Sequence, residues 1–257
     1  MIITLKALLP ISHGEFSDGI DLGNAQVFRH LPMIHDGRVY DVPVISGNAI
    51  RGKIRRVLAR EIVEVFDLKN QLGKSFDRFY VALANGGNLD KDMDIIIDTE
   101  KIRQIRDDIP MLSLLGSALY KYMMPGMVNI GFAIPRCREI GTGDGIGLND
   151  LTADVGLTRH LDKTVADPGD AKPMPYTVEV LIPGVELDVN VEFAPQTTPI
   201  EIACLMHGFK LVTSVGGKSG AGFGLIDKEG VADDQLYKDW LNDTDSLDKL
   251  IKFAGAL

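Results

Sequence analysis

The stretch from Val42 to Arg60 constrains the fold most, because it predicts a strand that passes directly into an amphipathic helix. The β-branched run Val42–Ile45 is typical of a strand end, and Ser46 follows it as a candidate N-cap. Apolar residues then recur with the helical period of about 3.6, which places them on one face. These residues are Ile50, Ile54, Val57, Leu58, Ile62 and Val65.

Five basic residues and no acidic one flank that face between Arg51 and Arg60. Unpaired N–H groups of a first turn, a nearby hydroxyl and guanidinium groups are the chemistry that holds phosphate. We therefore expect an anion site where this helix begins. The alternative is an ordinary surface helix with a solvated basic side, in which Ser46 and Asn48 serve only as caps.

A second notable stretch, Gly216–Gly224, contains five glycines in nine residues, which allows the backbone to approach a ligand closely. It is not a nucleotide-hydrolase phosphate loop, because that motif requires a glycine where Val212 stands. The order of elements is also wrong, since here a helix precedes the loop and a strand follows it. A flexible connector is the alternative to a ligand-binding loop.

Length and composition predict a cytoplasmic globular protein. The 257 residues are 45% hydrophobic and 25% charged, which suits one large domain with insertions or two small ones. No run is long enough to span a membrane, and the N-terminus lacks a signal-peptide layout. Cys137 and Cys204 lie far apart, which predicts a reducing compartment and no zinc site. We expect no metal and no cofactor.

The net charge of −9 at first argues against nucleic acid, whose binding normally leaves a basic footprint. However, residues 85–108 and 227–257 together supply −7 of that charge. The five basic residues of 51–60 therefore form a local patch, and a ligand meets the patch rather than the average. An acidic interaction module that binds no nucleic acid is the alternative that the net charge favours.

The order of predicted elements indicates an α+β fold with a ferredoxin-like or RNA-recognition-motif core that carries insertions. Thr198–Glu201 forms a capping box at the start of a helix that has one apolar side. Two stretches interrupt this order: 69–108 is a polar stretch with some helical periodicity, and 141–175 is a long excursion. The remaining expected elements are strands at Ile2–Leu9 and Met127–Ile134, a hairpin tip at His35–Arg38, a short helix or turn at Pro110–Met124 packed around Gly116, a hairpin of Tyr176–Ile182 with Glu186–Phe193, and an acidic helix at Asp233–Phe253.

Five motifs in this order resemble the RAMP superfamily of CRISPR-associated proteins, and in particular the repeating backbone subunit of multi-subunit effector complexes. The form V-P-V-I-S-G-N-A-I-R-G is more similar to the type I and type IV subunits than to the type III ones. The motifs are L-P-I-S-H-G at Leu9–Gly14, V-P-V-I-S-G-N-A-I-R-G-K-I-R at Val42–Arg55, P-M-L-S-L-L-G at Pro110–Gly116, Y-T-V-E-V-L-I-P-G at Tyr176–Gly184 and G-G-K-S-G-A-G-F-G at Gly216–Gly224.

The resemblance implies one hand-like domain over residues 1–257. Its palm would be the ferredoxin-like core, 69–108 would be a helical insertion, and 141–175 would be a projecting thumb. Guide RNA would run over the palm, and copies of the chain would stack along it. The implied partners are guide RNA, complementary target nucleic acid, other copies of the chain and other CRISPR effector subunits, with no membrane.

The resemblance and the residue chemistry together select candidate RNA-binding residues in two groups. Ser46 and Asn48 would hydrogen-bond guide phosphates and the arginines would pair with them in a forked manner, indifferent to guide sequence. The first group surrounds the helix start and comprises Ser46, Gly47, Asn48, Arg51, Lys53 and Arg55. The second comprises Gly217, Lys218, Ser219 and Gly220 of the glycine loop, together with Arg29 and His13.

The resemblance also addresses catalysis. Type III relatives cleave target RNA with an aspartate, and the matching position here is Asn24, which lacks a carboxylate; Asp18 and Asp21 lie near it. Guide-processing ribonucleases of the superfamily use a loop histidine, and His13 has no Tyr or Lys placed beside it in sequence. We therefore predict no catalytic residue, with an endoribonuclease that slices target or processes guide as the alternative.

Overall fold

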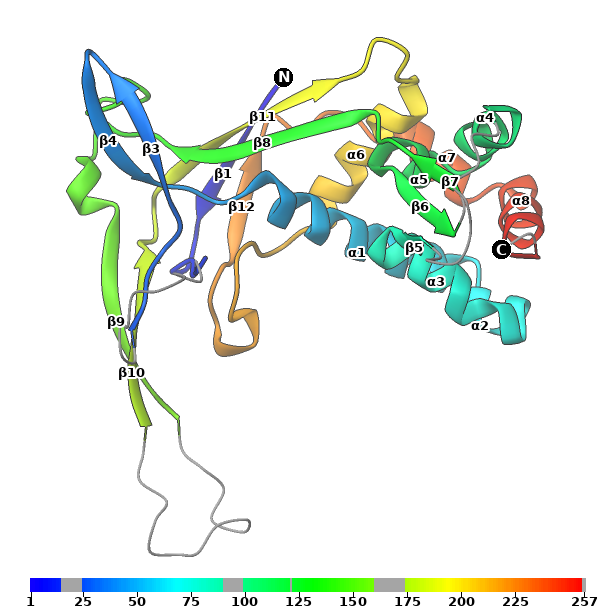
Figure 1. Cartoon of the computed structure of the whole chain (residues 1–257), viewed down its shortest axis with the longest axis horizontal. Helices are drawn as coiled ribbons and strands as arrows, with labels where there is room; N and C mark the ends of the chain where they lie inside the picture. Colours follow the sequence, from blue (N-terminus) through cyan, green and yellow to red (C-terminus); the bar gives the residue numbers. More distant parts are fainter. Residues whose placement is uncertain (15–24, 90–98, 121, 160–173, 256–257) are drawn as a thin grey trace, which may run out of the picture.

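The computed structural model describes residues 1–14, 25–89, 99–120, 122–159 and 174–255 (Figure 1). Its centre is a four-stranded antiparallel sheet in the order β12-β1-β11-β8. The chain order β1-α1-β8-β11-α6-β12 over that sheet is the ferredoxin-like arrangement, which confirms the predicted α+β class. The elements are β1 (Ile2–Ala7), α1 (Gly47–Val65), β8 (Val128–Pro135), β11 (Glu186–Phe193), α6 (Pro199–Leu211) and β12 (Ile226–Glu229).

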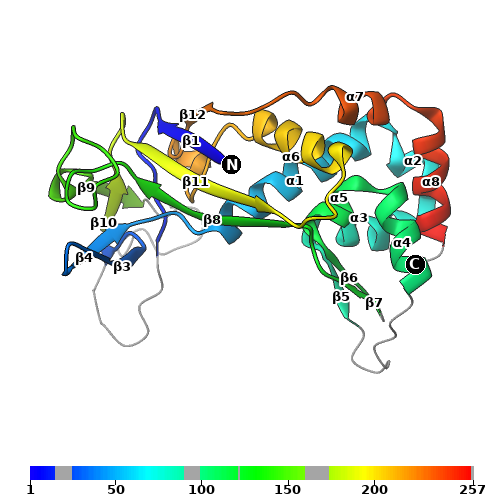
Figure 2. The ribbon, with the colours of Figure 1, turned by 90° about the horizontal axis from the view of Figure 1, so that it is seen from above.

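Helices α1 and α6 cover one face of this sheet (Figure 2). The apolar period of α1 is confirmed at Ile50, Ile54, Leu58 and Ile62, which are all fully buried. Val65 departs from it, because it lies at the C-terminal end of the helix and is 49% exposed. The periodic face thus packs α1 into the core, beside strand β8 and helix α6.

The predicted capping box at the start of α6 is confirmed, with the Thr198 N–H donating to Glu201 Oε2 at 2.6 Å. The predicted apolar side of this helix is buried at Leu205, Phe209 and Val212, but burial extends beyond that side. Residues from Ala203 to Phe209 are buried all round, because α1, α5 (Pro110–Leu115) and α7 (Gln235–Leu241) pack against α6 as well. A helix that is buried on all sides has no solvated face, so its apolar residues show no amphipathic period.

Strands β3 (His30–His35) and β4 (Arg38–Pro43) form the predicted hairpin, with His35 paired to Arg38. Asp36 and Gly37 have φ of 48° and 74°, the left-handed pair that a two-residue type I′ turn requires. The tip predicted from the H-D-G-R run is therefore confirmed.

The second predicted hairpin is wrong in its pairing, although both of its strands exist. Strand β10 (Met174–Leu181) pairs with β9 (Thr152–Arg159) and β2 (Ala25–Gln26), whereas β11 pairs with β1 and β8. The turn at Gly184 instead passes the chain across to the end of β1, where Gly184 N donates to Ala7 O. Alternation of polar and apolar residues predicts strands but not their partners.

Helices and short strands occupy the other half of the molecule. One acidic helix was predicted near the C-terminus, but α7 ends at Leu241 and α8 (Thr244–Gly255) begins after Asn242 and Asp243. Short polar side chains compete for backbone hydrogen bonds, and the Asp243 carboxylate accepts from Asp245 N at this break. The remaining elements are α2 (Leu68–Leu72), η1 (Gly73–Ser75), α3 (Phe76–Asn85), β5 (Gly87–Leu89), α4 (Thr99–Asp108), β6 (Ser117–Tyr120), β7 (Tyr122–Met124), η2 (Leu148–Asp150) and η3 (Ser219–Ala221).

Candidate nucleic-acid interface

The start of α1 is built as an N-cap that also holds a histidine. Ser46 Oγ accepts a hydrogen bond from Ala49 N at 3.3 Å, as the sequence predicts. The N–H of Ser46 donates to His13 Nε2 at 3.2 Å. Two candidate residues that lie 33 positions apart in the chain are thus in contact at the helix start.

The glycine loop reaches the same place through the segment that carries His13. Gly217 N donates to Ser12 O at 2.6 Å, and the two residues form an isolated antiparallel bridge. Arg29 lies on the other side of this segment, with its N–H donating to His13 O at 2.8 Å. Ser12 and His13 therefore connect the glycine loop, Arg29 and the cap at Ser46, which brings members of both predicted groups together.

The candidate residues differ in how far they reach solvent. Asn48, Gly217, Ser219 and Gly220 are exposed. Gly47 and Arg55 are buried, and the other candidates are half-buried. The half-buried ones are His13, Arg29, Ser46, Arg51, Lys53 and Lys218.

Arg55 lies in a place that phosphate cannot reach, contrary to the predicted forked contact. Its guanidinium donates to Leu83 O at 3.3 Å, Leu115 O at 2.7 Å and Gly116 O at 2.6 Å. Leu83 and Leu115 lie in the last turns of α3 and α5, whose terminal carbonyls lack helical partners. Burial, and next the charge of Arg51, lower the pKa of Arg55 to about 10, which leaves it charged at neutral pH.

Arg51 is partly engaged in the same way, since its Nη2 donates to Leu115 O. Burial lowers the pKa of Arg51 and of Lys53, because desolvation disfavours their charged forms. Lys53 keeps part of its surface in solvent and Asn48 is exposed one turn earlier. The cationic part of this surface is therefore smaller than the five basic residues of the sequence suggest.

Gly47 has a packing role that the sequence did not reveal. A Cβ at this position would lie 1.9 Å from Ile130 O, in strand β8. The helix start therefore sits directly on the backbone of the sheet, and only glycine allows this approach. The geometry explains why glycine follows the cap, without any contact to a ligand.

The glycine loop is held by the rest of the protein, which disagrees with the interpretation as a flexible connector. Lys218 O accepts from Ala221 N at 2.9 Å, and Gly224 N donates to Pro10 O at 2.8 Å. Phe223 is 8% exposed and packs with Val178 and Val180 of β10 in a small apolar cluster. The loop therefore presents its exposed residues from a fixed frame.

Lys218 contacts an aromatic residue, Tyr176, that was not among the predicted binding residues. Its Nζ lies 4.8 Å from the centroid of the Tyr176 ring, in β10. The motif at Tyr176–Gly184 marked this segment, but strand periodicity gave no reason to single out its first residue. The pair forms because the fold places the glycine loop beside the start of strand β10.

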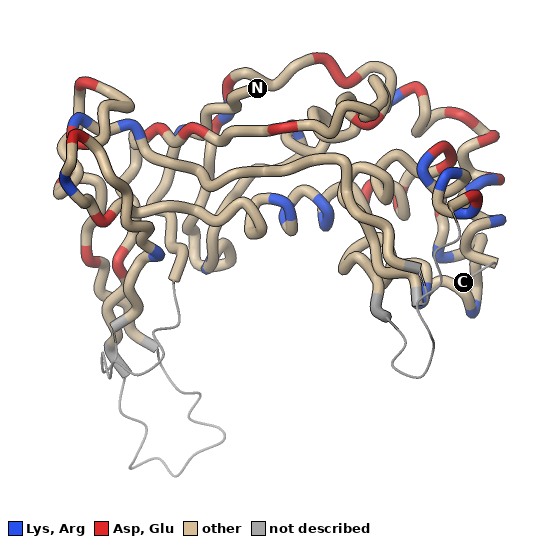
Figure 3. Tube along the Cα trace, turned by 45° about the horizontal axis from the view of Figure 1, so that its top comes forward, with Lys and Arg blue, Asp and Glu red and all other residues tan. Residues whose placement is uncertain are grey.

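Charge is distributed unevenly over the molecule (Figure 3). Lys and Arg of α1 lie between two projections, the β9–β10 hairpin and the β5–β6–β7 sheet, while many Asp and Glu lie along the opposite margin. On the palm sheet Arg136 donates to Glu186 Oε2 at 2.8 Å and to Asp188 Oδ1 at 2.9 Å. These pairs balance the local charge on that sheet, and Lys6 adds a third at 3.7 Å from Glu186.

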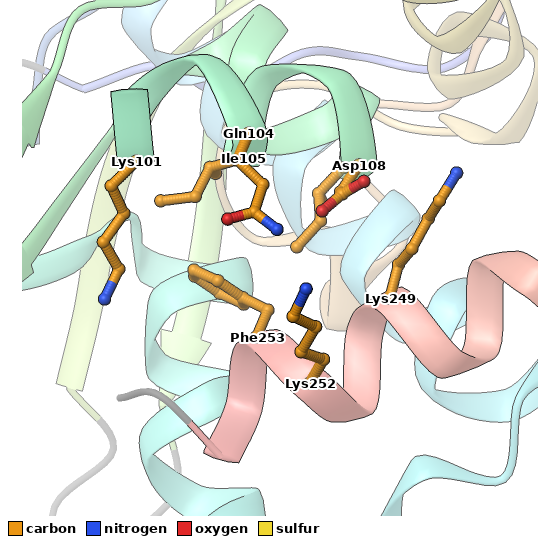
Figure 4. Close-up of a pocket in the computed structure, with 8 residues that line it drawn as sticks. Lys101, Gln104, Ile105, Asp108, Lys249, Lys252 and Phe253 are labelled. Carbon is orange, nitrogen blue, oxygen red and sulfur yellow. The ribbon is translucent and has the colours of Figure 1, made fainter. Parts of the chain in front are cut away.

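A small pocket of about 50 Å³ lies between α4 and α8 (Figure 4). Its floor is apolar, with the Phe253 ring in its centre, and three lysines and Asp108 surround it. Figure 1 places these helices at the end of the molecule opposite the β9–β10 hairpin. The pocket is therefore separate from the surface around Ser46 and Lys218.

Within the described ranges, no cluster of three or more His, Cys, Asp or Glu side chains could hold a metal ion. Both cysteines are buried and free. In the same residues, no helix combines the length and apolarity needed to cross a bilayer. Asp18, Asp21 and Asn24, on which the predictions about cleavage depend, lie outside the described residues.

No protein-family model and no curated protein matches this sequence. Its fold is similar to that of a chain in a "Type IV-B CRISPR Complex", with a TM-score of 0.60 and 20% identity over 89% of this chain and 88% of that chain. At this level of identity the likeness shows that the two chains share a fold.

A second similar chain belongs to the "Cryo-EM structure of the Type III-B Cmr-beta bound to cognate target RNA". The TM-score is 0.44 and the identity 14%, over 90% of this chain and 59% of that chain. That likeness is too distant to support an argument.

Proposed function

We propose that this chain binds the phosphate backbone of guide RNA and assembles with copies of itself along that RNA in a CRISPR effector complex. The observation that carries the proposal is the convergence of two distant segments. Ser12 and His13 connect the glycine loop at Gly217 to the helix start at Ser46. The fold shared with a chain of a type IV-B CRISPR complex supports the same role.

The exposed groups of this surface suit a phosphate backbone better than base edges. The exposed Asn48 and Ser219 offer short hydrogen-bonding side chains, and the half-buried Lys53 and Lys218 offer point charges. Such contacts fix the position of the strand without reading its sequence, which leaves the bases free to pair with a target. Arg55 is not part of this proposal because its donors already serve carbonyl groups.

We further propose that the chain acts without cleaving RNA. His13, the candidate base of a guide-processing enzyme, already uses its Nε2 lone pair to accept from Ser46 N. The opposite outcome has a clear signature: incubation with complementary RNA and Mg²⁺ would give regularly spaced cuts that disappear in Asp18→Ala or Asp21→Ala. Such cuts would establish the endoribonuclease alternative.

Binding to labelled poly(U) and poly(A), measured by fluorescence anisotropy over a series of salt concentrations, tests RNA binding directly. We expect both RNAs to bind, with affinity that falls steeply as salt rises. Lys53→Glu and Lys218→Glu should each weaken binding by about tenfold or more, from a lost contact and a repulsion. The matched control is Lys252→Glu on α8, an exposed lysine at the other end of the molecule, which should bind as the wild type does.

Equal affinity in all three variants would reject the proposed surface, and no binding to either RNA would support the acidic interaction module instead. Assembly is tested separately by the mass of the complex in light scattering as RNA length increases. Several copies per long RNA are expected, whereas a strict monomer on guide-length RNA would contradict assembly.

A further inference from the structure

Lys218 has a backbone conformation that is costly for its residue type. Its φ is 56° and its ψ is 27°, in the left-handed region. Among the described non-glycine residues, only Asp36 and Asp67 share a positive φ with it, and aspartate tolerates this region far better than lysine. In a loop where five of nine residues are glycine, a lysine at this position indicates that its side chain is needed.

The conformation places that side chain on an aromatic ring. Lys218 Nζ lies 4.8 Å from the centroid of Tyr176, within the range of a cation–π contact. An ammonium group has three N–H donors, so a group held over a ring retains donors that point away from it. The contact therefore restrains the charge without neutralising it.

Tyr176 is itself well fixed. It belongs to β10, where it pairs with Leu157 of β9, and it packs against the apolar cluster of Val178, Val180 and Phe223. Phe223, at the end of the glycine loop, is buried in the same apolar cluster. The loop is thus attached to the β9–β10 hairpin twice, through Phe223 and through the ring that holds Lys218.

We propose that Tyr176 is a positioning residue for RNA binding: its ring holds the Lys218 ammonium at a fixed place where it meets a phosphate of the bound strand. The inference rests on the proposed function and adds a residue and a mechanism to it. A lysine side chain free in solution loses conformational entropy when it binds. Because the ring already restrains it, less is lost when the phosphate arrives.

The experiment compares Tyr176→Phe and Tyr176→Leu, using poly(U) anisotropy over a salt series and thermal melting of each free protein. Phenylalanine keeps an aromatic face and should bind as the wild type does. Leucine keeps bulk and apolarity but has no ring, and should weaken binding roughly three- to tenfold. If Lys218 then no longer contacts a phosphate, the slope of log affinity against log salt should decrease in magnitude by about 0.7, the value for one phosphate of a single strand.

A double-mutant cycle completes the design. Once Lys218→Met has removed the charge, Tyr176→Leu should have no further effect on affinity. Three outcomes would overturn the inference: wild-type affinity in Tyr176→Leu, a loss as large in Tyr176→Phe, or a loss that persists in the Lys218→Met background. Each of these is distinguishable from failure of the proposed function, in which wild-type protein itself would not bind poly(U).

Discussion

His207 Nδ1 lies 2.7 Å from Asp234 Oδ2 in the interior of the protein, where His207 is 5% and Asp234 1% exposed. The other ring nitrogen, Nε2, lies 2.6 Å from Glu61 Oε2. Lys210 and Lys238 also reach the Asp234 carboxylate, at 2.8 and 3.1 Å. A histidine in α6 thereby ties α1 to the segment that begins α7, in a network whose charges depend on pH.

Stability should decrease as the pH rises above about 6.5. Burial alone would lower the pKa of His207, but hydrogen bonds with Glu61 and Asp234 outweigh it and raise the pKa above the ordinary 6.5. A raised pKa means that the stabilisation is complete below 6.5 and is lost as the pH passes through the folded value, at no more than about 1.4 kcal/mol per pH unit. Urea unfolding at several pH values measures this. His207→Gln should flatten the curve and His35→Gln, at the hairpin tip, should not; equal slopes would exclude His207 as the cause.

On the acid side the same network should protect the fold to unusually low pH. Burial would raise the pKa of Asp234, but hydrogen bonds from Lys210, His207 and Lys238 lower it well below 3.8. A lowered pKa gives stabilisation above the ordinary value that disappears as the pH falls through the folded one. Asp234→Asn should therefore unfold at higher pH than the wild type in an acid titration followed by circular dichroism. Coinciding titrations would contradict the assignment.

Arg55→Met should destabilise the protein by roughly 3 kcal/mol, because it removes the guanidinium donor from Leu83 O and Gly116 O and leaves Leu115 O with Arg51 alone. Arg56→Met is the matched control on the same helix, and its exposed side chain should change stability by less than about 0.5 kcal/mol. Chemical denaturation gives both values. A loss of RNA affinity in Arg55→Met at unchanged stability would restore the predicted phosphate contact.

Two glycines of α1 should respond oppositely to alanine. Gly47→Ala places a Cβ 1.9 Å from Ile130 O and should cost roughly 2–4 kcal/mol, since helix and strand must separate. At Gly52 the nearest atom is Arg56 Nη1 at 3.5 Å, so Gly52→Ala should stabilise by up to about 1 kcal/mol through helix propensity. Thermal melting orders the variants, and a Gly47→Ala protein as stable as the wild type would disprove the close approach.

Lys218→Gly should separate stability from function. Glycine adopts the left-handed conformation freely, so the free energy of unfolding should stay within about 1 kcal/mol of the wild type or rise. RNA affinity should nevertheless fall, because the side chain is gone. If affinity and stability fell together, the lysine would be serving the loop rather than the ligand.

Local patterns predicted the elements of this fold well where one physical rule governs a short segment. The His35–Arg38 tip follows from turn chemistry, the Thr198–Glu201 cap from hydrogen bonding, and the buried face of α1 from its period. The same rules failed where several elements meet. Burial on all sides erased the period of α6, and β10 took β9 as its partner instead of β11.

The sequence by itself determined the α+β class, the helix that Ser46 caps and the glycine-rich loop at Gly216–Gly224. It could not distinguish an arginine that meets solvent from one that caps two helices, because Arg56 and Arg55 have the same charge and are neighbours on the same helix. Only the tertiary structure decided that difference, together with the contact between Lys218 and Tyr176. The physical reason is that a charge acquires its role from what surrounds it, and here those surroundings come from segments distant in the chain.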